Sequence, residues 1–194
     1  MGSVLLRKMR SLVMSSLRHG ASLARVARVR LLYGDVQVPW STSIGHSVML
    51  QATDGGKLVI GAGVSIGAGS QLVAQGGVLS IGCDTFVGIG CVLTSKVEMS
   101  IGRDVLIAEY VTIRDQDHRF PVGKRIRESG FDCAPVLIGN DVWIGAKSSV
   151  LKGARIGAGA VIAAHSLVKG EVAENTLAAG IPARFIKVRP DATD

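Results

Sequence analysis

A six-residue repeat runs through most of this chain of 194 residues. Each unit begins with an aliphatic residue, usually followed by a small one, and a small or β-branched residue stands four positions after the first. The early units begin at Ile60, Ile66, Ile81, Val87, Ile101 and Ile107, and the later ones at Ile138, Ile144, Val150, Ile156 and Ile162. A period of six matches neither a helix nor an isolated strand, so it predicts a solenoid with one short strand and one corner per unit.

In such a solenoid the stacked coils form three parallel sheets around a narrow core. The aliphatic residue points inward, and glycine takes the corner where a Cβ atom would clash. Composition agrees with a thin core, because 47% of the residues are hydrophobic but only 4% are aromatic. We therefore expect an all-β solenoid domain over residues 35–190, with a terminal strand or turn after the repeat ends at Ile181-Pro182.

Residues 1–34 form a separate basic segment with seven Lys or Arg residues and no acidic one. Since the formal net charge of the whole chain is +7, the solenoid itself is neutral. The segment has no interleaved aromatic residues and no recognition motif, which argues against nucleic-acid binding. The apolar spacing over residues 3–32 predicts helix, divided into two by Gly20.

Two alternatives remain open for this basic segment. It packs on its own solenoid or on a neighbouring subunit, or residues 1–30 rest on an anionic membrane surface. No run approaches the roughly 18 apolar residues of a membrane span, and the pattern of a secretory signal is missing. We expect a cytoplasmic protein, with peripheral contact at the inner face of the membrane as the second possibility.

The repeat has one large interruption, a polar loop at residues 114–135. Loops of this length in compact domains are usually functional or disordered, and regular coils on both sides let this one project. It contains His118, whose imidazole titrates near neutral pH and can accept a proton from a hydroxyl group. Asp115 and Asp117 stand close enough in sequence to orient the ring. The alternative is an exposed histidine with incidental acidic neighbours.

Other chemistries find little support in the sequence. Cys91 falls on an inward position, Cys83 on a corner and Cys133 in the interruption, which predicts reduced thiols rather than a disulfide framework. A zinc site is not expected, because no second histidine follows His118 before His165 and no CxxC motif occurs. The glycines belong to the repeat and form no phosphate-binding loop.

Residues 135–187 carry two longer motifs, IGNDVWIG and AGIPARFIK. Together with the loop histidine they resemble the hexapeptide-repeat acyltransferases, especially galactoside and maltose acetyltransferases and the O-acetyltransferases of bacterial polysaccharide synthesis. The resemblance extends weakly back to about residue 35. It implies a left-handed parallel β-helix, acetyl-CoA as donor, and a homotrimer with active sites between subunits.

The resemblance also implies roles for individual residues. His118 would be the general base, Trp143 would stand at the mouth of the cleft, and Ala146 and Ala164 would line the pantetheine arm. Lys169, Arg184 and Lys187 match the region that meets the nucleotide end of coenzyme A, where basic side chains pair with phosphate.

Three departures from the family pattern bear on the acceptor. Gly90 stands where the galactoside and maltose enzymes have asparagine, Lys169-Gly170 replaces Thr-Lys, and the chain begins with a basic helix. They favour a polysaccharide or lipid-linked acceptor over a free small sugar. The sequence thus predicts an acetyl-CoA-dependent O-acetyltransferase acting on a sugar hydroxyl. An amino-sugar N-acetyltransferase, a xenobiotic acetyltransferase and a non-catalytic β-helix scaffold are the alternatives.

Overall fold

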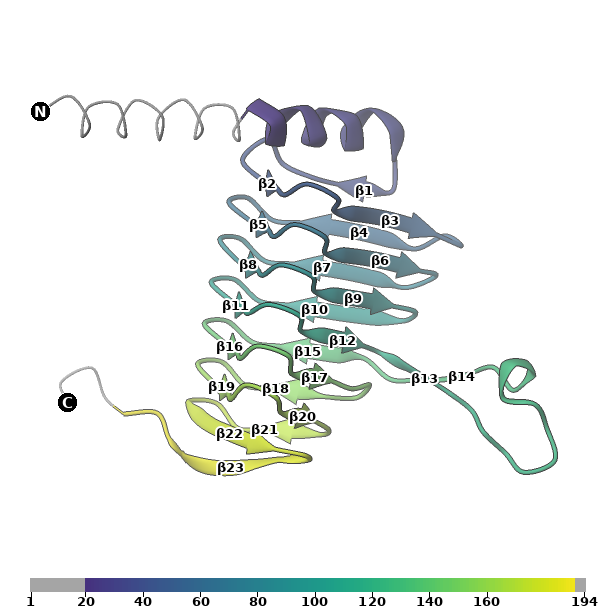
Figure 1. The fold of residues 1–194 in the computed structure, drawn as a ribbon, viewed down its shortest axis with the longest axis vertical. Coiled ribbons are helices and arrows are strands. Elements are labelled where there is room, and N and C mark those ends of the chain that lie inside the picture. Colours follow the sequence, from purple (N-terminus) through teal and green to yellow (C-terminus); the bar gives the residue numbers. More distant parts are fainter. Residues whose placement is uncertain (1–19, 191–194) are drawn as a thin grey trace, which may run out of the picture.

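The computed structural model describes residues 20–190 and forms a parallel β-solenoid covered by a helix at its N-terminal end (Figure 1). Each coil gives one strand to each of three sheets, here named A, B and C in the order in which the chain visits them. Neighbouring strands pair in parallel, except for the last pair of sheet B and the hairpin of the loop. The predicted solenoid is therefore confirmed.

Sheet A contains β1 (Val36–Gln37), β4 (Lys57–Ile60), β7 (Val78–Ile81), β10 (Glu98–Ile101), β15 (Val136–Ile138), β18 (Arg155–Ile156) and β21 (Glu171–Val172). Sheet B contains β2 (Ser43–Ile44), β5 (Ser65–Ile66), β8 (Phe86–Val87), β11 (Leu106–Ile107), β16 (Trp143–Ile144), β19 (Val161–Ile162), β22 (Thr176–Gly180) and β23 (Ala183–Val188). Sheet C contains β3 (Met49–Thr53), β6 (Gln71–Gln75), β9 (Val92–Ser95), β12 (Thr112–Arg114), β17 (Ser149–Val150) and β20 (Leu167–Val168).

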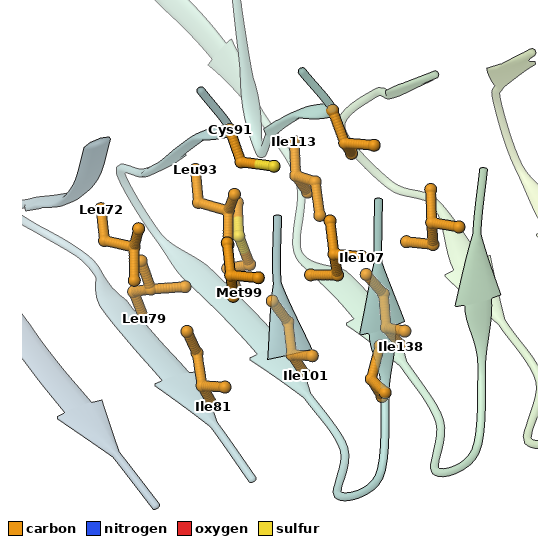
Figure 2. Close-up of a cluster of buried hydrophobic side chains, with 14 of the residues drawn as sticks. Leu72, Leu79, Ile81, Cys91, Leu93, Met99, Ile101, Ile107, Ile113 and Ile138 are labelled. Carbon is orange, nitrogen blue, oxygen red and sulfur yellow. The ribbon is translucent and has the colours of Figure 1, made fainter. Parts of the chain in front are cut away.

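The core is a stack of aliphatic side chains at equivalent positions of successive coils. Ile81, Ile101 and Ile138 are register partners in sheet A, and all three point into the prism (Figure 2). Cys91 belongs to the same core and is fully buried, and its burial raises the pKa of the thiol. The first residue of each repeat therefore points inward as predicted, and Cys91 has the inward position expected for it.

Glycines close the corners because successive coils approach too closely for a side chain. A Cβ atom on Gly61 would lie 2.6 Å from the backbone nitrogen of Cys83, and one on Gly82 would lie 2.5 Å from the carbonyl carbon of Gly102. The left-handed backbone of the corner between sheets A and B occurs two residues after these glycines. There it is taken by glycine or by Asp and Asn, which tolerate positive φ: Gly63, Asp84, Asp104, Asp141, Gly159 and Asn175.

Residues 20–32 are helical and cover the open end of the first coil. The backbone N–H of Ile44 donates to Ser22 Oγ (2.7 Å), and Arg25 donates to the carbonyl oxygen of Ile44 (2.9 Å). Val26 is fully buried, and Arg30 donates to the carbonyl oxygen of Val38 (2.7 Å). These contacts satisfy an otherwise open sheet edge, as edge strands require. For these residues the structure supports packing on the solenoid.

Gly20 is the first described residue, so the helix predicted before it and the apolar stripe of that helix lie outside the described residues. Within residues 20–190, no helix has the length and apolar character needed to cross a membrane. At the other end of the chain, β23 turns back and pairs antiparallel with β22, which confirms the predicted terminal strand.

The interruption leaves the solenoid after β12, at the corner between sheets C and A, and returns at β15. Its two arms form an antiparallel hairpin of β13 (Gln116–His118) and β14 (Phe131–Cys133), with the 3-10 helix η1 (Ile126–Glu128) between them. Figure 1 shows the hairpin extending sideways from the stack of coils. The sequence predicted that the loop projects, but not that it contains paired strands.

Candidate active site

His118 ends β13 and is exposed on the projecting hairpin. Its partner across the ladder is Phe131 of β14, so the two side chains lie on the same face of the hairpin. The ring centroids are 4.3 Å apart and the ring planes are tilted by 36°. Lys96, from the corner of the preceding coil, places its Nζ 4.4 Å from the centroid of the Phe131 ring.

A cavity of about 640 Å³ opens beside His118, between the hairpin and the following coils. The corners after β17 and β20 form its other side. Its lining residues are Asp117, His118, Arg119, Phe120, Pro121, Asp132, Leu151, Lys152 and Lys169. This volume lies within the usual range of small-molecule sites, roughly 300–1,000 Å³.

A lysine of the next coil ties the hairpin to the solenoid. Asp117 and Asp132 face each other across the ladder, a pairing of like charges that disfavours the hairpin. Lys152 donates a hydrogen bond to Asp132, which lowers the pKa of that carboxyl group, and the same bond raises the pKa of Lys152. The charge of Asp117 raises the pKa of Lys152 further. The lysine therefore offsets the repulsion between the two acids.

Asp115 does not orient His118 in this structure. Its fully buried carboxylate accepts hydrogen bonds from Ser95 Oγ (2.8 Å) and from the backbone N–H groups of Lys96 (2.7 Å), Val97 (2.9 Å) and Glu98 (3.0 Å). Both carboxylate oxygens are thus used by the corner of the preceding coil. Asp115 anchors the root of the loop, whereas Asp117 lies in the cavity with His118.

The other predicted site residues lie elsewhere on the chain. Trp143 is on the outer side of sheet B, and Ala146 and Ala164 are on successive corners between sheets B and C. Arg184 and Lys187 lie on β23 at the end of sheet B. Within one chain, therefore, these five residues do not line the cavity, which lies at the corner between sheets C and A. Lys169 is the exception, because it lines that cavity with His118.

Gly90 has a structural reason to lack the side chain found in the related enzymes. Its φ is +65°, and a Cβ atom there would lie 2.6 Å from two ring carbons of Tyr110. Tyr110 stands at the same corner of the next coil and is exposed. An asparagine at position 90 would need the tyrosine ring to move, so the departure at Gly90 is coupled to Tyr110.

The arrangement suits proton abstraction by an imidazole in an open, partly basic cavity. The sequence indicated His118 as a candidate but did not point to Phe131, Lys96 or Lys152. Phe131 is separated from His118 by twelve residues, and only the hairpin pairing joins them. Within the described part of the chain, no group of three His, Cys, Asp or Glu residues is arranged to hold a metal ion.

Comparison with known proteins gives consistent matches. The bacterial transferase hexapeptide family (six repeats) matches residues 135–170. The "Probable acetyltransferase Rv3034c" of Mycobacterium tuberculosis is 34% identical over 167 residues, covering 85% of this chain and 56% of that protein. The "Putative lipopolysaccharide biosynthesis O-acetyl transferase WbbJ" of Escherichia coli is 36% identical over 145 residues, covering 68% of this chain and 72% of that protein.

Among solved structures, a mutant of AntD, an N-acyltransferase from Bacillus cereus in complex with dTDP and coenzyme A, has a TM-score of 0.64. It is 19% identical, and the match covers 77% of this chain and 84% of that one. At this identity the likeness concerns the fold. The chain spans just over half the length of its mycobacterial relative and nearly three quarters of the relative from Escherichia coli.

Proposed function

Because this chain belongs to the hexapeptide-repeat acetyltransferase family, we propose that it transfers an acetyl group from acetyl-CoA to a hydroxyl group of a sugar. The observation that carries the proposal is the position of His118, exposed on a hairpin and facing a cavity of about 640 Å³. A β-helix that served only as a scaffold would have no need for a histidine beside a cavity of ligand size.

In the proposed reaction His118 is the general base. A ring nitrogen takes the proton of the acceptor hydroxyl as its oxygen attacks the thioester carbonyl carbon of acetyl-CoA. The carbon–sulfur bond then breaks, and the imidazolium returns the proton to the departing thiolate. The products are an acetyl ester and free coenzyme A, and no acyl-enzyme forms. Accordingly, none of the three cysteines takes part in the chemistry.

A homotrimer is part of this proposal, because one chain does not bring the predicted residues together. On the outer side of sheet B, Phe86, Leu106 and Trp143 are register partners and expose 45%, 53% and 52% of their surface. Such a column of exposed apolar side chains marks a surface that another molecule covers. A neighbouring copy seated there would bring its own loop beside Trp143, Ala146 and Ala164.

The coenzyme would then extend from His118 along the corners toward β23. Ala146 and Ala164 leave room for the pantetheine arm, and Arg184 and Lys187 would pair with its phosphates. Lys169 would act nearer the reacting groups than the sequence predicted, because it lines the same cavity as His118. No metal is required for this transfer.

The proposed acceptor is a polysaccharide or its lipid-linked precursor on the cytoplasmic side of the membrane. The name of the Escherichia coli relative, which refers to lipopolysaccharide biosynthesis, supports this choice. The second candidate is an amino sugar acetylated on nitrogen, favoured by the fold shared with an N-acyltransferase. Peripheral membrane contact through residues 1–30 stays a proposal. Arg25 and Arg30 donate hydrogen bonds to the solenoid, so the other basic residues of the segment would have to provide most of this contact.

The experiment is a thiol-release assay with acetyl-CoA and matched pairs of acceptors that differ only in hydroxyl or amino groups. The products are then treated with alkaline hydroxylamine, which cleaves acetyl esters and spares amides. We expect acceptor-dependent release of coenzyme A and a product that hydroxylamine cleaves. A stable product would instead establish N-acetylation. If none of the acceptors increases thiol release and acetyl-CoA does not bind, the scaffold alternative would be favoured.

A further inference from the structure

We infer that Phe131 is a positioning residue for His118, and that Lys96 holds Phe131 in place. The inference rests on the proposed role of His118 as general base. It concerns two residues that the hexapeptide motifs do not include, one in the loop and one on the preceding coil. Together with Asp115 they form a continuous set of contacts from the buried solenoid to the exposed imidazole.

The hairpin needs such support because it projects away from the coils. A two-stranded hairpin is marginally stable in water by itself. An exposed side chain on such a hairpin samples several rotamers, and fixing one of them costs conformational entropy. His118 is exposed, and its one aromatic contact in the described residues is the ring of Phe131 at 4.3 Å. A tilted pair at this centroid distance is attractive, so it restricts the imidazole to one side of the hairpin.

The Phe131 ring is itself held from the solenoid. It is half-buried, and the Lys96 ammonium lies 4.4 Å from its centroid, within the range of a cation–π contact. Lys96 belongs to the corner between β9 and β10, and its backbone N–H donates to Asp115 at 2.7 Å. The same corner therefore holds the root of the loop through Asp115 and the aromatic ring through Lys96.

This geometry predicts an effect on the chemical step rather than on donor binding. A general base must meet the acceptor proton within hydrogen-bond reach, and misplacing a reacting group by 1 Å can cost about 100-fold in rate. We expect Phe131→Ala and Phe131→Leu to lower kcat about tenfold with little change in the KM for acetyl-CoA, the scale of an aromatic pair. Phe131→Tyr keeps the ring and should retain activity within about twofold.

Lys96→Met keeps the apolar stem and removes the charge, so it should lower kcat about threefold, the lower end of the range for a cation–π contact. Combined with Phe131→Ala it should add no further loss, since Lys96 acts through the ring. Val122→Ala is the matched control, because Val122 is a fully exposed residue of the same loop and does not line the cavity.

The test that separates positioning from a structural role uses His118→Ala as background. If Phe131 acts through the imidazole, His118→Ala/Phe131→Ala should turn over as slowly as His118→Ala alone. A readout independent of activity is the NMR signal of the His118 ring, which the ring current of Phe131 displaces. Phe131→Ala and Phe131→Leu should move this signal, and Phe131→Tyr and Val122→Ala should leave it in place.

The positioning role would be overturned by wild-type kcat in Phe131→Leu, by an unmoved His118 signal in Phe131→Ala, or by slower turnover in His118→Ala/Phe131→Ala than in His118→Ala alone. Each of these results would leave the proposed function intact. Wild-type turnover in His118→Ala would overturn both proposals, because no general base would then be left for Phe131 to position.

Discussion

The stacked coils and the projecting loop differ in how strongly their surroundings constrain them. In the coils each backbone position is fixed from above and below: Gly82 cannot carry a Cβ atom, and Ile101 is buried between register partners. In the loop, His118 and Phe120 are exposed and a few side-chain contacts hold the hairpin. The coils should therefore tolerate little change in volume, whereas the exposed positions of the loop should tolerate more change than its buried root at Asp115.

This difference shows how a solenoid acquires a site. A corner can hold an inserted loop because the coils on either side keep their own hydrogen bonds, as β12 and β17 do by pairing directly across the insertion. The loop is held at its root. Asp115 binds the coil before it, and Lys152 of the coil after it binds Asp132 of the hairpin. Substitutions in the two regions should consequently fail in different ways.

The largest effect is expected from Gly82→Ala in the coils. The new Cβ atom would lie 2.5 Å from the backbone of the next coil, which no side-chain movement relieves. We expect a loss of about 3 kcal/mol or more in the free energy of unfolding, at the upper end of overpacking costs. Gly34→Ala, which meets open space, is the control and should stay within about 0.5 kcal/mol. Equal thermal unfolding midpoints for both variants would contradict the close stacking.

His118→Ala should have the opposite signature. We expect kcat to fall by about 10²–10⁴, the usual contribution of a general base, with an unchanged unfolding midpoint. The physical reason is that His118 is exposed and buries little surface, but would supply the proton acceptor in the proposed mechanism. Steady-state kinetics with saturating acetyl-CoA and circular dichroism measure the two quantities on the same preparations. Near-wild-type turnover would remove His118 from the mechanism. Loss of the folded structure would contradict the expectation that loop substitutions affect activity rather than stability.

Arg184→Ala combined with Lys187→Ala should show that the coils contribute binding rather than chemistry. Both side chains are exposed on β23, far along the chain from the hairpin. Remote phosphate contacts act equally on ground and transition states, so we expect the KM for acetyl-CoA to rise about tenfold and kcat to change little. In the wild type, removing the ribose phosphate of the donor should raise its KM, because a phosphate contact is lost. In this variant, acetyl-CoA and its dephospho form should have similar KM values. An unchanged KM would remove both residues from the coenzyme site.

The smallest effect is expected at the pair that joins loop and coil. Hydrogen bonding to Lys152 lowers the pKa of Asp132, so the contact is present at neutral pH and is lost as pH falls through that lowered pKa. Because both groups reach solvent, overall stability should hardly change. A ¹³C titration of the Asp132 carboxyl group should move toward the ordinary value of about 3.9 in Lys152→Met. Lys147→Met is the control on another corner, and an identical Asp132 titration in wild type and Lys152→Met would deny the contact.

The sequence by itself determined the solenoid. A six-residue period is a local rule that each coil repeats, so the inward aliphatic positions, the glycine corners and the projecting loop all follow from the order of the residues. The inward place of Cys91 and the terminal strand at the end of the repeat followed from the same register. His118 could be proposed as the general base because it stands in a polar interruption, at a position that matches the catalytic histidine of a known family.

The tertiary structure decided which residues meet. Asp115 is three residues from His118 in sequence, yet its carboxylate binds the preceding coil, because β13 turns away at that point. Phe131 and Lys152 are distant in sequence and stand beside the site, because strand pairing and coil stacking bring them there. The six-residue period specifies what points inward, but outward contacts between a loop and its neighbouring coils depend on the path of the chain in space.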